Sequence, residues 1–465
     1  MASYDEIRPF NISIPDEQLN QLHNKLELTR LPDELDLPAK DIMASYDEIR
    51  PFNISIPDEQ LNQLHNKLEL TRLPDELDLP AGQEWEWGIP LAVLKPIIDY
   101  WQTKYDWRAV EERINENLPQ FTTYAESAKH GKQEVHFVHK RSESPNAVPL
   151  LFVHGWPGNF LEVSKMIEEL VKPKDTKHPS FHVIAPSLPG YVFSQRASSP
   201  GMNAIGTAYL FDQLMRKLGY KYYVAQGGDW GALVVRALAV HHQDTCLATH
   251  TNMNMGGAPT PLKNPIMTMK TILGSAGLPG GYPKDEMDRI AGVKEFMATG
   301  TGYSQIQGSR PQTLAVALTD SPAGLLAWIG EKLHIWTDNY AWTPEEVITW
   351  TILYWVNGPA GGLRYYKENS INGPPKDPKL RAELNHLRST WSSTPLGFSW
   401  FPKEILALPA EWAGINQRLV YYKKHNKGGH FAAWEVPELL ANDIQNFIAI
   451  VLEKEPRLLD VSGRL

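Results

Sequence analysis

Residues 221–240 read KYYVAQGGDWGALVVRALAV, and they combine three local patterns that indicate the class of fold. Residues 221–226 have the composition of a strand, and the alanine- and valine-rich run after Gly231 has that of a helix. Between them, Gly227, Gly228 and Gly231 surround Asp229. A strand, a sharp glycine turn and a helix are typical of a nucleophile elbow, in which serine usually occupies the position of this aspartate. The glycines are expected because the elbow residue is strained and its neighbours pack closely.

The predicted turn places Asp229 at the N-terminus of a helix, where a negative charge is stabilised. A carboxylate that stays ionised in this position can attack carbon. The alternative is a simple turn in which Asp229 only caps the helix, because aspartate is a good N-cap. The segments on either side of the elbow favour the nucleophile.

Those segments alternate between strand and helix patterns. Strand patterns occupy 133–139, 148–153 and 181–186, and helix patterns occupy 161–171 and 207–218. Strands that alternate with helices pair in parallel through right-handed crossovers, so we expect an α/β fold with a mostly parallel, doubly wound sheet. Residues 256–395 read instead as turns and tryptophan-rich helices, before a strand pattern at 417–422 and a helix pattern at 437–452. We therefore expect a helical lid inserted into the sheet.

The start of the chain contains a duplication. Residues 1–39 recur at 43–81 without one substitution. Solenoid repeats diverge and number about three or more, so two identical copies are not a solenoid. We interpret residues 1–42 as a spare copy outside the fold and Met43 as the working start; the alternative is a real second N-terminal element. The expected units are a helical N-terminal segment (43–128), two core parts (129–255 and 396–465) and the lid (256–395).

Composition narrows the class of protein. The chain has 465 residues, with 45 Lys and Arg against 54 Asp and Glu, giving a net charge of −9. A chain with this acidic charge balance is a poor partner for nucleic acid or anionic lipid. The single cysteine, Cys246, excludes an internal disulfide. The sequence has neither a signal peptide at its start nor a run of about 18 apolar residues, so we expect a soluble, cytoplasmic protein without stable membrane insertion.

Two further motifs complete a catalytic pattern. HGWPG at 154–158 follows a strand and precedes the elbow, where enzymes with such an elbow carry their oxyanion loop. GGHF at 428–431 follows the last strand pattern, where they carry a catalytic histidine, here His430. An acid is expected between elbow and histidine, and Glu404 and Glu411 are both candidates. Glu404 is favoured because FPKE at 401–404 lies where the chain should re-enter the sheet.

The chain resembles the microsomal-type epoxide hydrolases, a family of α/β-hydrolases. The resemblance covers residues 43–465 and depends on several motifs in the expected order. They are PFNISIPDEQLNQLHNKLELTRLPDE, HGWPG, GGDWGA, GYSQIQ, RYYKEN, FPKE and GGHFAAWEVPELLANDI. One departure is the missing N-terminal membrane anchor that some relatives carry, which leaves the catalytic pattern intact.

The resemblance implies a role for each site residue. Asp229 matches the nucleophile, His430 the general base and Glu404 its orienting acid. Tyr303 and Tyr366 match the lid tyrosines that bind the epoxide oxygen and supply its proton; the Lys-Glu-Asn that follows distinguishes Tyr366 from Tyr365. Backbone N–H groups of Trp156 and Trp230 would hold the oxyanion, and the side chains of Trp156, Trp230, Tyr303 and Tyr366 would line the substrate site.

The expected reaction converts an epoxide and water into a vicinal diol through an Asp229 ester, without a metal or organic cofactor. The expected partner is a small apolar epoxide, and relatives of this kind often pair as homodimers. Two alternatives stay open. A haloalkane dehalogenase uses the same combination of aspartate, histidine and acid but needs no proton donors such as Tyr303. A non-catalytic ligand-binding protein would be expected to lack at least one of Asp229, Glu404 and His430.

Overall fold

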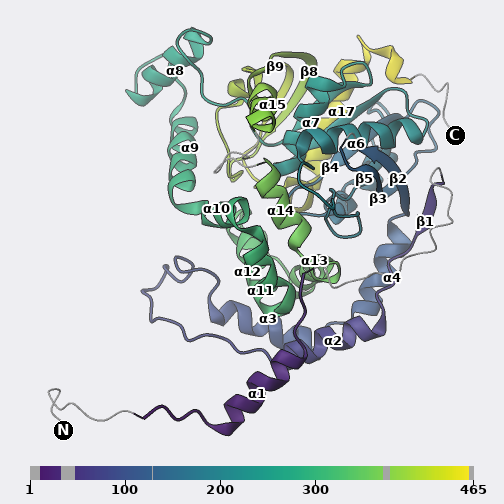
Figure 1. The fold of residues 1–465 in the computed structure, drawn as a ribbon. Coiled ribbons are helices and arrows are strands. Elements are labelled where there is room, and N and C mark those ends of the chain that lie inside the picture. Colours follow the sequence, from purple (N-terminus) through teal and green to yellow (C-terminus); the bar gives the residue numbers. More distant parts are fainter. Residues whose placement is uncertain (1–10, 33–47, 128, 370–377, 460–465) are drawn as a thin grey trace.

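The computed structural model describes residues 11–32, 48–127, 129–369 and 378–459. A nine-stranded sheet forms its centre, in the order β1-β2-β3-β5-β4-β6-β7-β8-β9 (Figure 1). The strands are β1 (Arg50–Phe52), β2 (Gln120–Ser127), β3 (Gly131–Lys140), β4 (Val148–Val153), β5 (Phe181–Pro186), β6 (Tyr223–Gly227), β7 (Cys246–Thr251), β8 (Ser392–Trp400) and β9 (Gln417–Lys424). Pairing is antiparallel from β1 through β3 to β5 and parallel from β5 to β9. The expected α/β fold is therefore confirmed.

The sequence patterns found five of these strands and missed four. The patterns at 148–153 and 181–186 coincide with β4 and β5. The missed strands are β1, β2, β7 and β8, of which β7 reads CLATHT and β8 reads SSTPLGFSW. Their polar residues hide the strand pattern because hydrogen bonds inside the core satisfy them. Gln417, for example, donates to the Thr249 hydroxyl at 2.7 Å.

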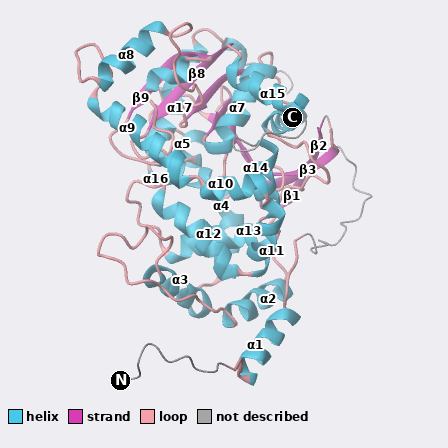
Figure 2. Cartoon of the chain, turned by 60° about the vertical axis from the view of Figure 1, so that its left-hand side comes forward, coloured by secondary structure: helices cyan, strands magenta, loops and turns pink. Residues whose placement is uncertain are grey.

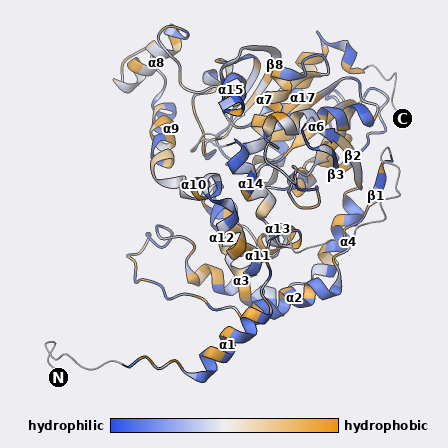
Figure 3. Cartoon of the chain, in the orientation of Figure 1, coloured by the Kyte–Doolittle hydropathy of each residue, from blue (hydrophilic) through white to orange (hydrophobic). Residues whose placement is uncertain are grey.

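Helices cover both faces of the sheet. Helix α5 (Ile167–Val171) connects β4 to β5, and α6 (Ala204–Lys217) connects β5 back across β4 to β6, so right-handed crossovers in opposite directions place these helices on opposite faces. Helix α7 (Asp229–His241) packs beside α6, and α17 (Pro437–Leu452) packs beside α5. Both α7 and α17 carry mostly hydrophobic residues (Figure 3). The pattern at 161–171 is divided between a 3-10 helix, η1 (Phe160–Lys165), and α5.

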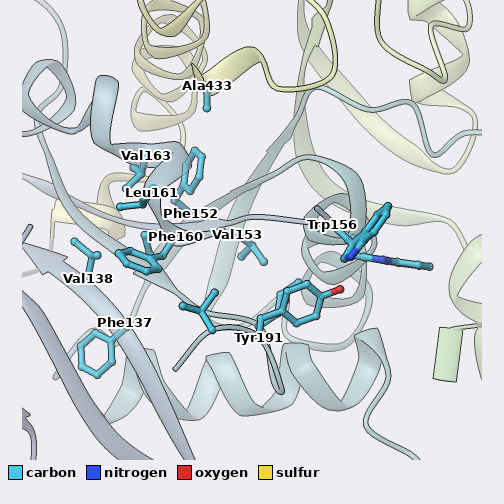
Figure 4. Packing of buried hydrophobic residues seen from close by; sticks show 14 of the residues in the cluster. Phe137, Val138, Phe152, Val153, Trp156, Phe160, Leu161, Val163, Tyr191 and Ala433 are labelled. Carbon is cyan, nitrogen blue, oxygen red and sulfur yellow. The ribbon is translucent and has the colours of Figure 1, made fainter. Parts of the chain in front are cut away.

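The core anchors the loop that follows β4. Phe152 and Val153 at the end of β4 lie near Phe160, Leu161 and Val163 of η1 in one buried cluster (Figure 4). The same cluster includes Trp156 of the HGWPG motif, whose side chain is 1% exposed. The motif is therefore held from both sides by packed side chains.

The lid is a group of helices between β7 and β8. Its members are α8 (Pro265–Ser275), α9 (Lys284–Glu295), α10 (Gly302–Ser309), α11 (Pro311–Asp320), α12 (Pro322–Ile335), α13 (Pro344–Val356), α14 (Ala360–Asn369) and α15 (Pro378–Ser389). Helices α10 to α13 form a layer between the sheet and the N-terminal helices α2 and α3 (Figure 2). Within the described ranges, no single helix is long and apolar enough to cross a membrane; α11 and α12 meet that test only together and are bent by 115°.

The N-terminal segment connects the lid to one edge of the sheet. Helix α2 (Asp58–Glu69) contacts α12, α3 (Leu91–Thr103) contacts α13, and β1 adds to the sheet edge beside β2. Helix α4 (Trp107–Asn117) lies between α3 and β2 along the chain and buries Trp107, Val110 and Ile114. The segment thus holds the lid against the core.

The two copies of the duplicated sequence have different environments. Helices α1 (Asp16–Glu27) and α2 share the sequence DEQLNQLHNKLE, yet α1 buries no residue and α2 buries Leu64, Lys67 and Leu68. Among the described residues 11–32 of the first copy, Arg30 is buried against the lid. Its guanidinium donates to the carbonyl oxygens of Trp355 and Val356, both at 2.7 Å, and lies 4.0 Å from the centre of the Trp355 ring.

Deleting residues 1–42 is expected to leave the activity of the protein unchanged and to lower Tm slightly. The change in Tm should come from Arg30, because its hydrogen bonds join the first copy to the end of α13. Arg30→Ala in the full chain is the matched variant and should lower Tm by a similar amount. Loss of turnover in the shorter chain would show that the first copy belongs to the working fold.

Candidate active site

Asp229 lies at a strained turn between β6 and α7. Its φ is 47°, in the left-handed region that few residues other than glycine adopt. The surrounding glycines allow this turn: a Cβ on Gly231 would lie 2.0 Å from the Val153 carbonyl oxygen, and one on Gly227 would lie 2.5 Å from that of Gly231. The carboxylate is thus fixed at the first turn of α7, where free backbone N–H groups favour negative charge.

The HGWPG loop touches the Asp229 carboxylate. The Trp156 N–H donates to Asp229 Oδ1 at 2.7 Å. A Cβ on Gly155 would lie 2.2 Å from that same oxygen, so only glycine permits the approach. Trp230, the residue after Asp229, lies in the first turn of α7, where a backbone N–H has no partner within the helix.

His430 connects Asp229 to Glu404. His430 Nε2 lies 3.4 Å from Asp229 Oδ2, and the opposite ring nitrogen, Nδ1, lies 2.9 Å and 3.1 Å from the two Glu404 oxygens. The side chains of His430 and Glu404 are both buried. Burial by itself would lower the pKa of His430, but the charges and hydrogen bonds of Glu404 and Asp229 outweigh it and raise that pKa well above its ordinary value.

The other candidate acid, Glu411, belongs to a different cluster. It accepts hydrogen bonds from Lys270 at 2.7 Å and 3.0 Å and from the Tyr282 hydroxyl at 3.1 Å. Of the two acids that the sequence left open, the geometry brings Glu404 to His430.

Two lid tyrosines lie close to the elbow. Tyr303 on α10 stacks on the Trp156 ring, with centroids 5.3 Å apart, and Tyr366 on α14 meets the Trp230 ring edge-on at 4.7 Å. Burial raises the pKa of Tyr303 and of Tyr366, and the nearby Asp229 charge adds to both shifts. Both hydroxyls therefore stay protonated at neutral pH and can act as hydrogen-bond donors.

The neighbouring Tyr365 has a separate partner. Its hydroxyl lies 2.9 Å from the Thr207 hydroxyl on α6. Tyr365 and Tyr366 therefore differ in their hydrogen-bond partners although they adjoin in sequence.

A small polar cavity adjoins the Asp229 carboxylate. Its lining includes Asp229, His430, Glu162, Gln226 and Asn252, and it has about 10 Å³ of free space, which is enough for a single water molecule. Gln226 is 1% exposed and its Oε1 has no hydrogen-bond partner. Burial raises the pKa of Glu162 to about 8, with His430 opposing that shift and Asp229 adding to it.

Sequence reasoning missed Glu162 and Gln226. Glu162 lies in an amphipathic stretch, where an acid usually faces solvent, and Gln226 ends a strand pattern. The only available signal was their closeness in sequence to HGWPG and to the elbow. Among the residues described, no group of three or more His, Cys, Asp or Glu side chains could hold a metal ion.

Comparison with known proteins agrees with this geometry. The family described as Epoxide hydrolase N terminus matches residues 49–163, and the alpha/beta hydrolase fold family matches residues 148–275. Epoxide hydrolase 1 of Sus scrofa is 35% identical over 474 residues, covering 97% of this chain and 90% of that protein. Juvenile hormone epoxide hydrolase 1 of Ctenocephalides felis is 32% identical and covers 80% of each chain.

Two solved structures share the architecture. The Aspergillus niger epoxide hydrolase has a TM-score of 0.73 and 31% identity, covering 91% of this chain and 99% of that one. The juvenile hormone epoxide hydrolase of Bombyx mori has a TM-score of 0.77 and 28% identity, covering 88% of this chain and 96% of that one. By this similarity across most of its length, the chain belongs to the epoxide hydrolases of the α/β-hydrolase fold.

Proposed function

We propose that the protein converts a small apolar epoxide and water into a vicinal diol through a covalent ester on Asp229. The observation that carries this proposal is the placement of the two Asp229 oxygens. Oδ1 accepts the Trp156 N–H, and Oδ2 faces His430, which is itself paired with Glu404. One oxygen is thus held as an oxyanion would be, and the other is free to attack.

In the first half-reaction, Asp229 Oδ2 attacks a ring carbon and the bond from that carbon to the ring oxygen breaks. The ring oxygen leaves as an alkoxide and takes a proton from Tyr303 or Tyr366. This assignment is supported by their location beside Trp156 and Trp230 and by their protonated state. The product is a hydroxyalkyl ester of Asp229.

In the second half-reaction, His430 takes a proton from water and the resulting hydroxide attacks Cγ of Asp229. The charge that develops on Oδ1 is stabilised by the N–H groups of Trp156 and Trp230. The bond from Cγ to Oδ2 then breaks, and the diol takes a proton from His430. The new carboxyl group ionises, and its proton returns to His430, which restores the resting enzyme. The cavity lined by Glu162 and Gln226 adjoins both reacting groups and suits the attacking water.

The charge of Asp229 determines when His430 can act as a base. In the resting enzyme the Asp229 charge helps keep His430 protonated. Ester formation removes that charge, so the pKa of His430 falls. Its proton passes to the tyrosinate that ester formation leaves, and the neutral imidazole becomes available as a base. The first step thereby prepares the second.

A single-turnover reaction in heavy-oxygen water tests the ester. With enzyme in excess over styrene oxide, the diol should contain no heavy oxygen and the peptide containing Asp229 should gain it. A second turnover by the labelled enzyme should release labelled diol. Label in the first diol, with an unlabelled peptide, would mean that water attacks the epoxide directly.

Removing either lid hydroxyl should slow ester formation. Tyr303→Phe and Tyr366→Phe are each expected to lower its rate about tenfold or more, because each removes one donor to the leaving oxygen. Tyr365→Phe is the matched control, since its hydroxyl bonds to Thr207. Stopped-flow measurement of Trp fluorescence would give the three rates. Equal effects at positions 365 and 366 would contradict the assignment.

Low pH should slow ester hydrolysis and spare ester formation. As pH falls from about 8 to about 5, His430 in the ester form becomes protonated and loses its capacity as a base. The resting enzyme already holds His430 protonated, so ester formation should change little over this range. Quenched-flow measurement of trapped ester should therefore show more ester at the lower pH. A parallel decrease of both rates would contradict this account.

A further inference from the structure

Four hydrogen bonds hold the loop that carries His430, and three of them join it to the lid; two of the four end on one side chain. Glu435, the last residue of α16 (Ala432–Glu435), accepts from the N–H of Asp338 at 2.7 Å and from that of Phe431 at 3.0 Å. Asp338 belongs to the lid segment after α12, whereas Phe431 directly follows His430. The Glu435 carboxylate therefore bridges two segments 93 residues apart in sequence.

The other two bonds run in the same region. The Gly428 N–H donates to Asp338 Oδ2 at 2.9 Å, and the His430 N–H donates to the Trp336 carbonyl oxygen at 2.9 Å. A Cβ on Gly429 would lie 2.6 Å from that carbonyl oxygen and 3.0 Å from Glu435 Oε1. The glycine before His430 is thus required by the close approach of the lid.

The same lid segment also touches the proton-donor side of the site. The Trp336 ring lies 5.1 Å from the His430 ring and 5.1 Å from the Tyr303 ring, measured between centroids. A shift of the segment at 336–338 would therefore change the position of the His430 imidazole relative to Tyr303. None of these contacts involves the triad carboxylates.

We propose that Glu435 is a positioning residue that fixes the His430 loop against the lid, so that the imidazole is aligned for attack of water on the Asp229 ester. This inference rests on the proposed function. Glu435 acts through two backbone N–H groups, that of Phe431 directly after His430 and that of Asp338 in the lid, and does not touch the reacting atoms. Its removal should impair the half-reaction that needs His430 and largely spare the one that needs Asp229 and the tyrosines.

The test compares the two half-reactions in Glu435→Ala and in the exposed control Glu438→Gln, which lies three residues further along the chain in the first turn of α17. Single-turnover kinetics with styrene oxide should show ester hydrolysis about tenfold slower in Glu435→Ala, with ester formation nearly unchanged. Glu435→Gln, which keeps one acceptor oxygen, should recover part of the loss. Asp338→Ala removes the acceptor of the Gly428 N–H from the lid side and should produce the same split. An equal decrease of both half-reactions, or no decrease of either, would overturn the proposal.

A second measurement is independent of the chemistry. Amide hydrogen exchange at residues 336–340 and 428–432 should become faster in Glu435→Ala and stay unchanged in Glu438→Gln, with the rest of the sheet protected as before. If the parent enzyme formed no ester, the proposed mechanism would fail, and hydrogen exchange alone would test whether Glu435 links the lid segment to the His430 loop. If the ester formed but exchange at both segments were unaffected by Glu435→Ala, the bridge itself would be wrong.

Discussion

Asp229→Ala is expected to abolish diol formation, with a loss of about 10⁴-fold or more in kcat. The substitution removes the only atom proposed to bond to the substrate and also the oxygen that accepts the Trp156 N–H. The positive φ of the elbow adds a minor cost, since alanine tolerates the left-handed region less well than aspartate does. The measurement is diol production from styrene oxide by chromatography, over hours and at high enzyme concentration.

The control is Asp244→Ala, a surface aspartate whose side chain is 77% exposed and lies 3.7 Å from Arg216. It should retain the activity of the parent. Circular dichroism and Tm of both variants would show that each is folded. Appreciable turnover by folded Asp229→Ala would mean that water attacks the epoxide without an ester, and the proposed mechanism would be wrong.

His430→Gln should stop the cycle halfway. Ester formation requires Asp229 and the tyrosines, so a burst of one epoxide per enzyme is expected, followed by steady turnover lowered about 10³-fold or more. The retained ester should be visible by intact-protein mass spectrometry as an addition equal to the mass of the epoxide. Glutamine keeps a polar group of similar length near Glu404, which limits the cost of leaving that buried carboxylate unpaired.

His65→Gln is the matched control, because His65 is on the surface of α2 with a side chain 52% exposed. It should show neither burst nor retained ester. Absence of the mass addition in folded His430→Gln, together with full loss of substrate consumption, would move His430 from the second half-reaction to the first.

The elbow at Asp229 could be predicted from sequence because its physics is local. A strained residue between a strand and a helix needs glycine on both sides, and Gly227, Gly228 and Gly231 provide this signal within five positions. The HGWPG loop could also be predicted from its local sequence. Geometry now places its Trp156 N–H on Asp229, and the assignment of roles to these residues remains a prediction for the experiments above.

Other parts of the site could not be predicted from the residues alone. Tyr303 and Tyr366 look like ordinary core aromatics, and only the family resemblance singled them out. Glu435 and Asp338 meet through backbone N–H groups, which leave no signature in side-chain patterns. Strand β8 was missed because serine, threonine, proline and glycine lower its apparent strand character, although eight of its nine residues are buried.

The identity of α1 and α2 has a consequence for how the chain folds. Either copy could compete for the groove that α2 occupies beside α12 and α3. Docking the first copy there would lengthen the connection to α3 threefold, because α1 ends at Glu27, α2 at Glu69, and α3 begins at Leu91. Loop-closure entropy then favours the second copy by about 1 kcal/mol, or roughly fivefold. The two copies are therefore alternative sequences for the same position beside α12 and α3, and loop-closure entropy favours the second copy, which is nearer to α3 in the chain.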